Sequence, residues 1–332
     1  MHCLYVIGRE CLALTKEKVK RQWLDVNNEK TKRLWLDIKK ARYLYLFLLP
    51  LMLWLIIFQY GPMYGLLMAF KDYKVRLGIL GSDWVGLEHF RKIFITPVAI
   101  DAILNTFKVS VGRLIWEFPL GIILAIMLTE MPGKKVKKAY QTIFTFPHFL
   151  SWVIVANILR HVLGNSGMVN EMLAFFGLER VDFVGRDSLF HTIIYITSNW
   201  KEVGWNAIIY MAAIAGIDTT LYDAAEIDGA SRFKRIWYIT LPGIRTTIAV
   251  MLILAVGGIM NAGMDQIFNM RNPLVENSAR ILDIYVYDLT FNSVPNHGFS
   301  TAVGLFKSLI NLFLLLFANW VVFKITDEKM FS

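Results

Sequence analysis

Two charged residues lie between two tryptophans inside a long apolar segment of this 332-residue chain, in the order Trp200-Lys201-Glu202-Val203-Gly204-Trp205. Charged and amide side chains are costly within apolar segments, so each predicts either a polar path or a helix-packing contact. Aromatic faces beside amides and charges can bind ligands that carry both apolar ring faces and hydroxyl groups, as sugars do. The candidates for lining such a path are Asn157, Asn199, Trp200, Lys201, Trp205 and Asn261.

Other charges in the apolar segments have simpler explanations. Arg113 and Glu117 are four residues apart and therefore neighbours on one helix face, so we expect them to neutralise each other. Lys108 and Lys307 lie near the ends of their segments, and we expect both to extend their ammonium groups toward water.

The sequence predicts no covalent chemistry in this chain. We find no paired carboxylate site and no Ser/His/Asp or metal-ligand grouping. A nucleotide-binding P-loop is not predicted either, because the only Gly-Lys pair, Gly133-Lys134, has Leu128 in place of the first glycine and Lys135 in place of the hydroxyl residue. We therefore expect no enzymatic activity, no metal and no cofactor here.

The elements that must position these residues are membrane helices. Of the residues, 56% are hydrophobic and only 18% are charged, and an apolar run of roughly 20 residues is needed to cross a bilayer as a helix. We therefore predict an all-α integral membrane protein with six transmembrane helices. Their expected ranges are 43–69, 102–129, 143–163, 189–215, 246–263 and 302–323.

The basic residues predict the orientation of the chain. If residues 1–42 are cytoplasmic, the inner segments hold 21 of the 35 lysines and arginines, which places both termini inside. We expect an amphipathic basic segment at 1–42, a permease domain at 43–324 and a short cytoplasmic tail at 325–332. The net charge of +9 favours anionic lipid as a partner over nucleic acid, because the basic residues adjoin the apolar segments.

A polar segment, Asp223–Ala230, lies between two long apolar runs and is followed by Ile239–Pro242. Asp218 and the two threonines after it supply N-cap residues, and we expect Asp223 in the first turn of a short helix. Gly229 allows a sharp turn or a close contact. Pro242 is placed where the next membrane helix can begin.

This segment resembles the cytoplasmic coupling loop, or EAA motif, of the membrane subunits of binding-protein-dependent ABC importers. Asp223 stands where that family usually has glutamate. The resemblance implies that residues 218–242 form a helix that docks in a groove of a separate ATPase. The residues expected at that contact are Asp223, Ala224, Ala225, Asp228, Gly229, Ile239, Leu241 and Pro242.

Four further segments are similar to LplB-type permeases of the carbohydrate-uptake importers. They are residues 147–153, Trp200–Trp205, Asn272–Val275 and Thr301–Ser308. The resemblance covers about residues 43–324 and implies the type I importer permease fold. It also implies a second, similar permease, two ATPase subunits that bind ATP and Mg, and an extracytoplasmic solute-binding protein. Members of this branch are associated with oligosaccharides, including uronate polymers such as alginate.

We therefore expect a bacterial inner-membrane permease subunit that imports oligosaccharides by alternating access. The excess of basic over acidic residues within the apolar segments favours an anionic sugar. The alternative is a secondary sugar transporter driven by an ion gradient, which commonly shows an internal repeat, and no repeat is evident between the halves of this sequence.

Overall fold

The structure, a computed structural model, describes residues 39–291 and 294–326. The predicted amphipathic segment therefore falls almost wholly outside the described residues, as does most of the predicted C-terminal tail. The chain divides into two units, at residues 1–65 and 66–332, and each is described by itself.

The first unit contains the helix α2 (Arg42–Leu55), which carries Pro50 in its interior. The helix continues as a π-helical turn, η1 (Ile56–Tyr60), and then as a 3₁₀ helix, η2 (Gly61–Phe70), which runs into the second unit. The α-helical pattern thus ends before Gly61-Pro62, where proline lacks an amide donor. No side chain of α2 is buried, and such an exposed apolar surface suits lipid.

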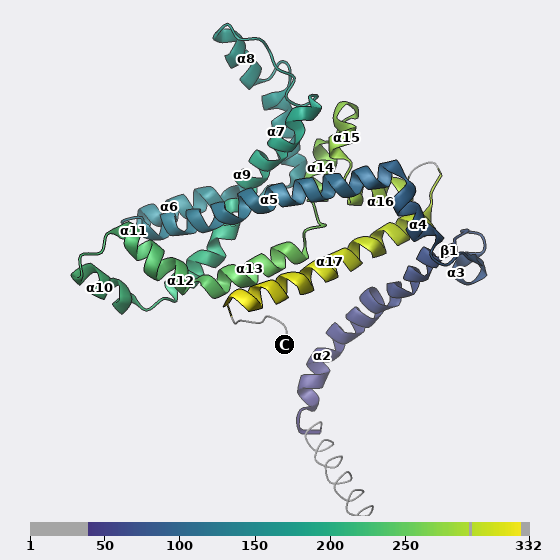
Figure 1. The fold of residues 1–332 in the computed structure, drawn as a ribbon, viewed down its shortest axis with the longest axis horizontal. Coiled ribbons are helices and arrows are strands. Elements are labelled where there is room, and N and C mark those ends of the chain that lie inside the picture. The colour runs from purple at the N-terminus through teal and green to yellow at the C-terminus, as the bar shows by residue number, and fades with distance from the viewer. Residues whose placement is uncertain (1–38, 292–293, 327–332) are drawn as a thin grey trace, which may run out of the picture. The chain divides into compact units, whose positions relative to one another are not determined.

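The second unit is built around four long helices, α5 (Pro97–Glu130), α9 (Asp187–Ala215), α13 (Arg245–Gly257) and α17 (His297–Thr326). Helix α5 packs along α9, and α13 packs along α17 (Figure 1). The contacts are apolar and include the fully buried Ala125, Ala207 and Ile253. Polar side chains of α5 and α9 face a cavity that α13 borders with apolar ones.

Shorter elements connect the long helices. The only strands among the described residues are β1 (Lys71–Asp72) and β2 (Asp83–Trp84), which pair antiparallel. The remaining helical elements are α3 (Gly78–Gly81), α4 (Glu88–Ile95), α6 (Lys134–Thr145), η3 (Phe146–Phe149), α7 (Trp152–Leu163), α8 (Met168–Phe175), α10 (Thr219–Ile227), α11 (Arg232–Arg235), η4 (Ile236–Thr240), α12 (Leu241–Gly243), α14 (Met264–Met270), η5 (Pro273–Val275), α15 (Glu276–Ala279) and α16 (Leu282–Phe291).

Three continuous helices in the described part of the chain are long and apolar enough to cross a membrane: Arg42–Phe70, Pro97–Glu130 and His297–Lys324. Two further candidates are bent pairs, by 97° between Lys134–Phe149 and Trp152–Phe175 and by 62° between Arg232–Gly243 and Arg245–Gly257. Helix α9 is not among these candidates, and its polar residues, which include Lys201 and Glu202, lower its hydropathy. The number of six transmembrane helices therefore stays a prediction.

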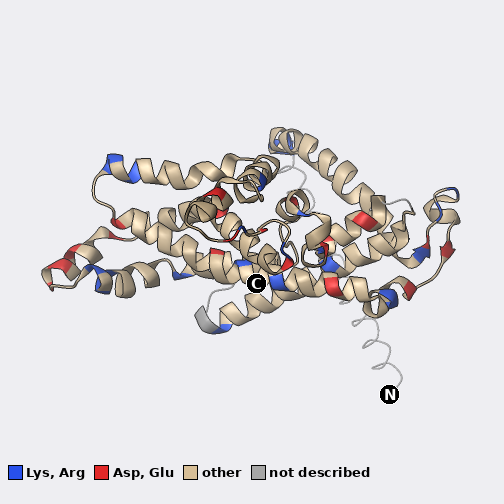
Figure 2. Ribbon diagram, turned by 90° about the horizontal axis from the view of Figure 1, so that it is seen from above, with Lys and Arg blue, Asp and Glu red and all other residues tan. Residues whose placement is uncertain are grey.

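Most charged residues of the second unit lie on the shorter elements and connections that join the long helices (Figure 2). One group lies on α10, on α11 and at the start of α6, at the left of the view, and the long middle parts of the helices carry few charges. The few charges within the long helices are consequently the ones that need an explanation.

Candidate functional site

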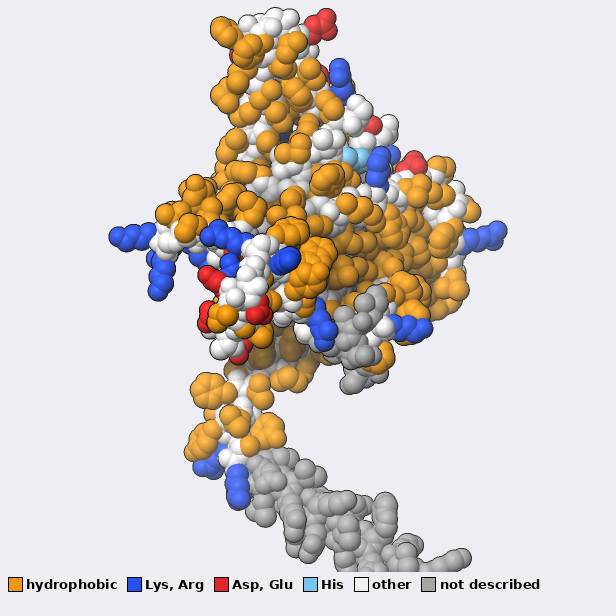
Figure 3. Space-filling view, turned by 60° about the vertical axis from the view of Figure 1, so that its left-hand side comes forward, with side chains coloured by type: hydrophobic (Ala, Val, Ile, Leu, Met, Phe, Trp, Pro, Cys, Tyr) orange, Lys and Arg blue, Asp and Glu red, His pale blue; other side chains and the backbone are white. Residues whose placement is uncertain are grey.

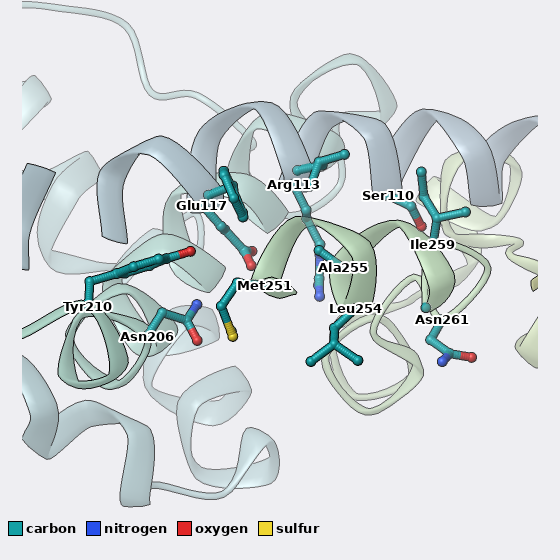
Figure 4. A pocket seen from close by; sticks show the side chains of 13 residues that line it. Ser110, Arg113, Glu117, Asn206, Tyr210, Met251, Leu254, Ala255, Ile259 and Asn261 are labelled. Atoms are coloured by element: carbon teal, nitrogen blue, oxygen red, sulfur yellow. The ribbon is translucent and has the colours of Figure 1, made fainter. Parts of the chain in front are cut away.

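A cavity of about 260 Å³ lies between α5, α9 and α13. Its polar lining comes from all three walls, with Arg113 and Glu117 on α5, Asn206 on α9 and Asn261 just beyond α13. In Figure 4 the side chains of Arg113 and Glu117 point from α5 toward the other two helices. The remaining lining residues are Ser110, Leu114, Phe118, Tyr210, Met251, Leu254, Ala255, Gly258 and Ile259.

Arg113 and Glu117 make no direct ion pair, although their opposite charges attract each other, as their spacing predicted. Arg113 Nη2 donates a hydrogen bond to Gln266 Oε1, and Glu117 Oε1 accepts one from the hydroxyl of Ser198. Within the described residues, no ion pair joins the two charges. The cavity therefore has a guanidinium and a carboxylate that are held apart.

Gln266 anchors this arrangement from the far side of the cavity wall. Its side chain is fully buried, and its Nε2 donates to Thr197 Oγ1 at 2.7 Å and to the Ile194 carbonyl at 2.9 Å. Because its amide group is fixed by two residues of α9, the oxygen that faces Arg113 is fixed as well. The network connects α5, α9 and α14.

The backbone between α13 and α14 is irregular where it borders the cavity. Gly263 has φ +79°, and a Cβ atom there would overlap the Arg113 guanidinium. Non-helical backbone at membrane depth is tolerated where it lines a cavity or is buried in protein. Residues 258–263 meet that condition, since Gly258, Ile259 and Asn261 line the cavity.

The structure brings only one of the six path candidates, Asn261, to this cavity. Asn157 is exposed on α7. Asn199 donates to the Tyr195 carbonyl at 2.8 Å within α9, and its Oδ1 atom is buried without a partner among the described residues. Trp200 is 51% exposed.

Lys201 and Trp205 belong to a separate cluster at the bend between η3 and α7. Lys201 Nζ donates to the His148 carbonyl at 2.6 Å and to Glu202 Oε1 at 3.2 Å, and it lies 5.3 Å from the ring centroid of Trp152. Glu202 Oε2 also lies 2.7 Å from His148 Nδ1. These contacts tie α9 to both sides of the bend, so this charged cluster has a clear packing role.

Lys307 also differs from its prediction. Its Nζ lies 2.5 Å from Asp283 Oδ1, and both side chains are largely buried, with 16% and 21% of their surface exposed. Lys307 therefore pairs with α16 and does not extend into water. Lys108 is exposed, but it lies well inside α5, which begins at Pro97, and not near the end of that helix.

The predicted coupling segment, residues 218–242, contains a well-capped short helix, α10. Asp218 is its N-cap and accepts a hydrogen bond from the Thr220 amide at 2.9 Å, which holds the pKa of Asp218 below its ordinary value. The helix contains no acidic residue in its first turn, so Asp223 lies one turn later than predicted.

Gly229 ends α10 in the left-handed region, at φ +72°. The Gly229 amide donates to the Glu226 carbonyl at 3.0 Å and the Ala230 amide to the Ala225 carbonyl at 2.8 Å. This is the hydrogen-bond pattern of a Schellman motif, in which glycine is preferred because it has no Cβ. The glycine thus reverses the chain direction after α10.

The second arm of the segment contains Ile239, Leu241 and Pro242. Tyr222 Oη lies 3.0 Å from Thr240 Oγ1, and Arg235 Nη1 lies 2.7 Å from Glu226 Oε2, so each arm contacts the other. Pro242 lies in α12, and the following helix, α13, begins only at Arg245. Proline cannot donate to the preceding turn, which is consistent with the π-helical turn η4 immediately before α12.

The outer surface of the coupling segment is accessible. Asp223, Ala224, Asp228, Gly229 and Pro242 are exposed, and the exposed apolar residues nearby include Ile227 at 87%. Ala225, Ile239 and Leu241 are half-buried. Figure 3 turns this end of the molecule forward and shows acidic and basic side chains gathered beside apolar ones.

Sequence reasoning missed two residues that line the cavity, Ser110 and Tyr210, and the hydrogen-bond partners of its two charges, Gln266 and Ser198. One available signal was the spacing of residues 110, 113 and 117, which places them on one face of α5. No local signal identifies Gln266 as the partner of Arg113, because 153 positions separate them.

Comparison with known proteins gives concordant matches. Residues 117–327 match the family model described as binding-protein-dependent transport system inner membrane component. The chain is 40% identical to protein LplB of Bacillus subtilis (strain 168), over 88% of this chain and 92% of the relative. It is 39% identical to the polygalacturonan/rhamnogalacturonan transport system permease protein YteP of the same organism, over 88% and 91%.

Two solved structures have the same fold. One belongs to a bacterial ABC transporter involved in the import of the acidic polysaccharide alginate, with a TM-score of 0.82 and 40% identity over 89% of this chain and 99% of that one. The other is a bacterial alginate ABC transporter in complex with an alginate pentasaccharide-bound periplasmic protein. Its TM-score is 0.83, with 39% identity over 90% and 100%.

Proposed function

Because the chain belongs to the family of binding-protein-dependent transport system inner membrane components, we propose that it is the permease subunit of an ATP-driven ABC importer for oligosaccharides, acidic ones in particular. Relatives named for polygalacturonan and rhamnogalacturonan transport and for alginate import support this substrate class. The relative solved with a pentasaccharide-bound periplasmic protein supports delivery by an extracytoplasmic binding protein.

The cavity between α5, α9 and α13 is the observation that supports this proposal most directly. It combines a guanidinium, a carboxylate and two amides with the ring of Phe118 and the apolar part of Tyr210. Sugar hydroxyls need donors and acceptors, whereas their ring faces need apolar contact. We place the transported saccharide in this cavity, with Asn261 among its contacts.

The coupling segment transmits ATP-driven motion in this proposal. Helix α10 is short, its Ala224 is exposed, and its Schellman turn at Gly229 presents bare backbone, so an ATPase groove can approach it closely. Closure of two ATPase subunits would move residues 218–242 and, through them, α9 and α13. The cavity would then open alternately to the two sides of the membrane.

The proposed topology has six spans, with both termini inside. Helix α9 is the fourth span, although it is less apolar than the others, because its charged residues have partners within the protein. Lys201 is only 5% exposed and contacts Glu202 and the His148 carbonyl. A second, similar permease would complete the translocation path.

Reconstitution tests the proposal. The complete complex, with its partner permease, ATPase and binding protein, is placed in vesicles, and uptake of an oligogalacturonate is followed with and without ATP. We expect uptake only when ATP and the binding protein are both present. Uptake that continues without nucleotide and stops when ion gradients are collapsed would support the secondary-transporter alternative instead.

A further inference from the structure

Arg113 is the only lysine or arginine that lines the cavity among the residues described by the structure. Its one hydrogen-bond partner there is Gln266, which is a neutral acceptor. The Nε atom of Arg113 is buried and has no partner among the described residues. The guanidinium thus has an unpaired Nε–H and no carboxylate in direct contact among the described residues, although Glu117 and Glu202 attract it from a distance. Burial of a charge is costly unless it is paired, so a carboxylate that bound here would stabilise it.

Glu117 does not complete this site, although it lies one turn away on the same wall. The Ser198 hydroxyl donates to its Oε1, so the acidic group is bonded toward α9 while Arg113 is bonded toward α14. A ligand acid could therefore approach Arg113 without displacing an existing ion pair. The charge of Glu117 would repel a second acid at the other end of the cavity.

Resting on the proposed function, we infer that Arg113 binds a carboxylate of the transported oligosaccharide and gives the cavity its preference for uronates over neutral sugars. The planar guanidinium matches carboxylate geometry and can donate two parallel hydrogen bonds. Gln266 and the Gly263 backbone hold the guanidinium in place, so little ordering remains to be done when the ligand arrives.

The alternative for Arg113 is a purely structural role as a connector between α5 and α14. The two roles differ in their response to ligand charge. A structural arginine affects acidic and neutral ligands alike, whereas a carboxylate-binding arginine affects only the acidic one. A trigalacturonate and its methyl ester provide this comparison, because they differ mainly in charge.

The experiment measures equilibrium binding of trigalacturonate and of its methyl ester to the purified permease–ATPase complex without binding protein. We expect the wild-type complex to prefer the acid by about tenfold or more, since a hydrogen bond to a charged group has roughly that value. Arg113→Gln should remove this preference and leave the affinity for the ester within about twofold, by the same reasoning. Arg91→Gln, the same change at an exposed residue of α4, should alter neither affinity.

Arg113→Lys keeps the charge but removes the planar fork, so it should reduce the preference only in part, and it serves where Arg113→Gln does not assemble. Loss of both affinities together in an Arg113 variant, or an unchanged preference in an assembled Arg113 variant, would overturn the inference. Wild-type complex that binds neither probe would overturn it too. ATP-dependent uptake of oligogalacturonate in vesicles would still stand in that case, so failure of this inference is distinguishable from failure of the proposed function.

Discussion

The imidazole ring of His148 lies flat on the indole of Trp205, with ring centroids 4.3 Å apart and planes 5° apart. His148 belongs to η3, at the bend before α7, and Trp205 belongs to α9. With Lys201 and Glu202 bonded to the same histidine, α9 holds the bent helix pair through one compact cluster. These contacts require the backbone of α9 to lie close to the backbone at the end of α6.

Gly204 should be essential for that approach. A Cβ atom at Gly204 would overlap the carbonyl group of Phe144 in α6, and backbone cannot move away as a side chain can. We expect Gly204→Ala to destabilise the protein by about 1–3 kcal/mol, as other overpacking changes do. Thermal unfolding in detergent measures the effect.

Gly304→Ala is the matched control, because Gly304 lies within α17 and a Cβ there meets nothing within 4 Å. Alanine is the better helix former, so this variant should be neutral or slightly more stable than wild type. Equal destabilisation by both changes would contradict the packing role that we assign to Gly204.

The coupling segment was the part of the molecule most fully predicted from the sequence, because its determinants are local. Asp218 caps the helix, and Gly229 ends it within a stretch of about twelve residues. The cavity was not predictable in the same way. Arg113 and Glu117 are neighbours in sequence, yet their partners, Gln266 and Ser198, are 153 and 81 positions away.

The bends were beyond prediction for a related reason. Hydropathy identifies a run of apolar residues but does not give the direction of the helix axis. Residues 143–163 were therefore predicted as one span, whereas the structure has a 97° bend at Leu150-Ser151. The partner of Lys307 was missed because Asp283 lies on a short helix, α16, in a connection whose packing depends on tertiary contacts.

Two substitutions of Gly229 test whether docking of the ATPase needs the left-handed backbone conformation at this position or only a small side chain. Gly229→Val places a β-branched residue at φ +72°, which should disrupt the end of α10 and release the ATPase from the purified complex. Gly229→Asn should retain the ATPase, because asparagine tolerates the left-handed region. Co-purified ATPase is quantified on gels, and its retention by both variants would show that this turn is not needed for docking.

The exposed face of Ala224 should lie against the ATPase. We expect Ala224→Cys to crosslink to the ATPase in the intact complex more efficiently than Ala225→Cys, because Ala225 is half-buried against the segment itself. Ala224→Trp should uncouple ATP hydrolysis from uptake, since the contact depends on a small side chain. Absence of crosslinks from both positions would argue against the docking surface.

Asp218 should make the start of α10 sensitive to acid. The Thr220 amide holds the pKa of this carboxyl below its ordinary value of 3.8, so the ionised form stabilises the folded helix. This stabilisation is present at neutral pH, and it is lost as the pH falls through the folded-state pKa. Amide hydrogen exchange at Thr220, corrected for intrinsic rates, should therefore accelerate below pH 4, within about the range expected for a carboxyl group.

Asp218→Ala is expected to show the fast exchange at every pH, whereas Asp218→Asn keeps an acceptor oxygen and should lose only the pH dependence. The same acid response in wild type and in Asp218→Asn would mean that another group titrates.

The ion pair between Lys307 and Asp283 should stabilise the contact of α17 with α16. Lys307→Met leaves a largely buried carboxylate without its partner, which costs more than the loss of the pair itself. We therefore expect each single variant, Lys307→Met or Asp283→Asn, to unfold at a lower temperature than wild type. The double variant should be more stable than the sum of the two effects predicts, with a coupling energy of about 0.5–3 kcal/mol. Additive effects would show that the two charges, although 2.5 Å apart, do not stabilise each other.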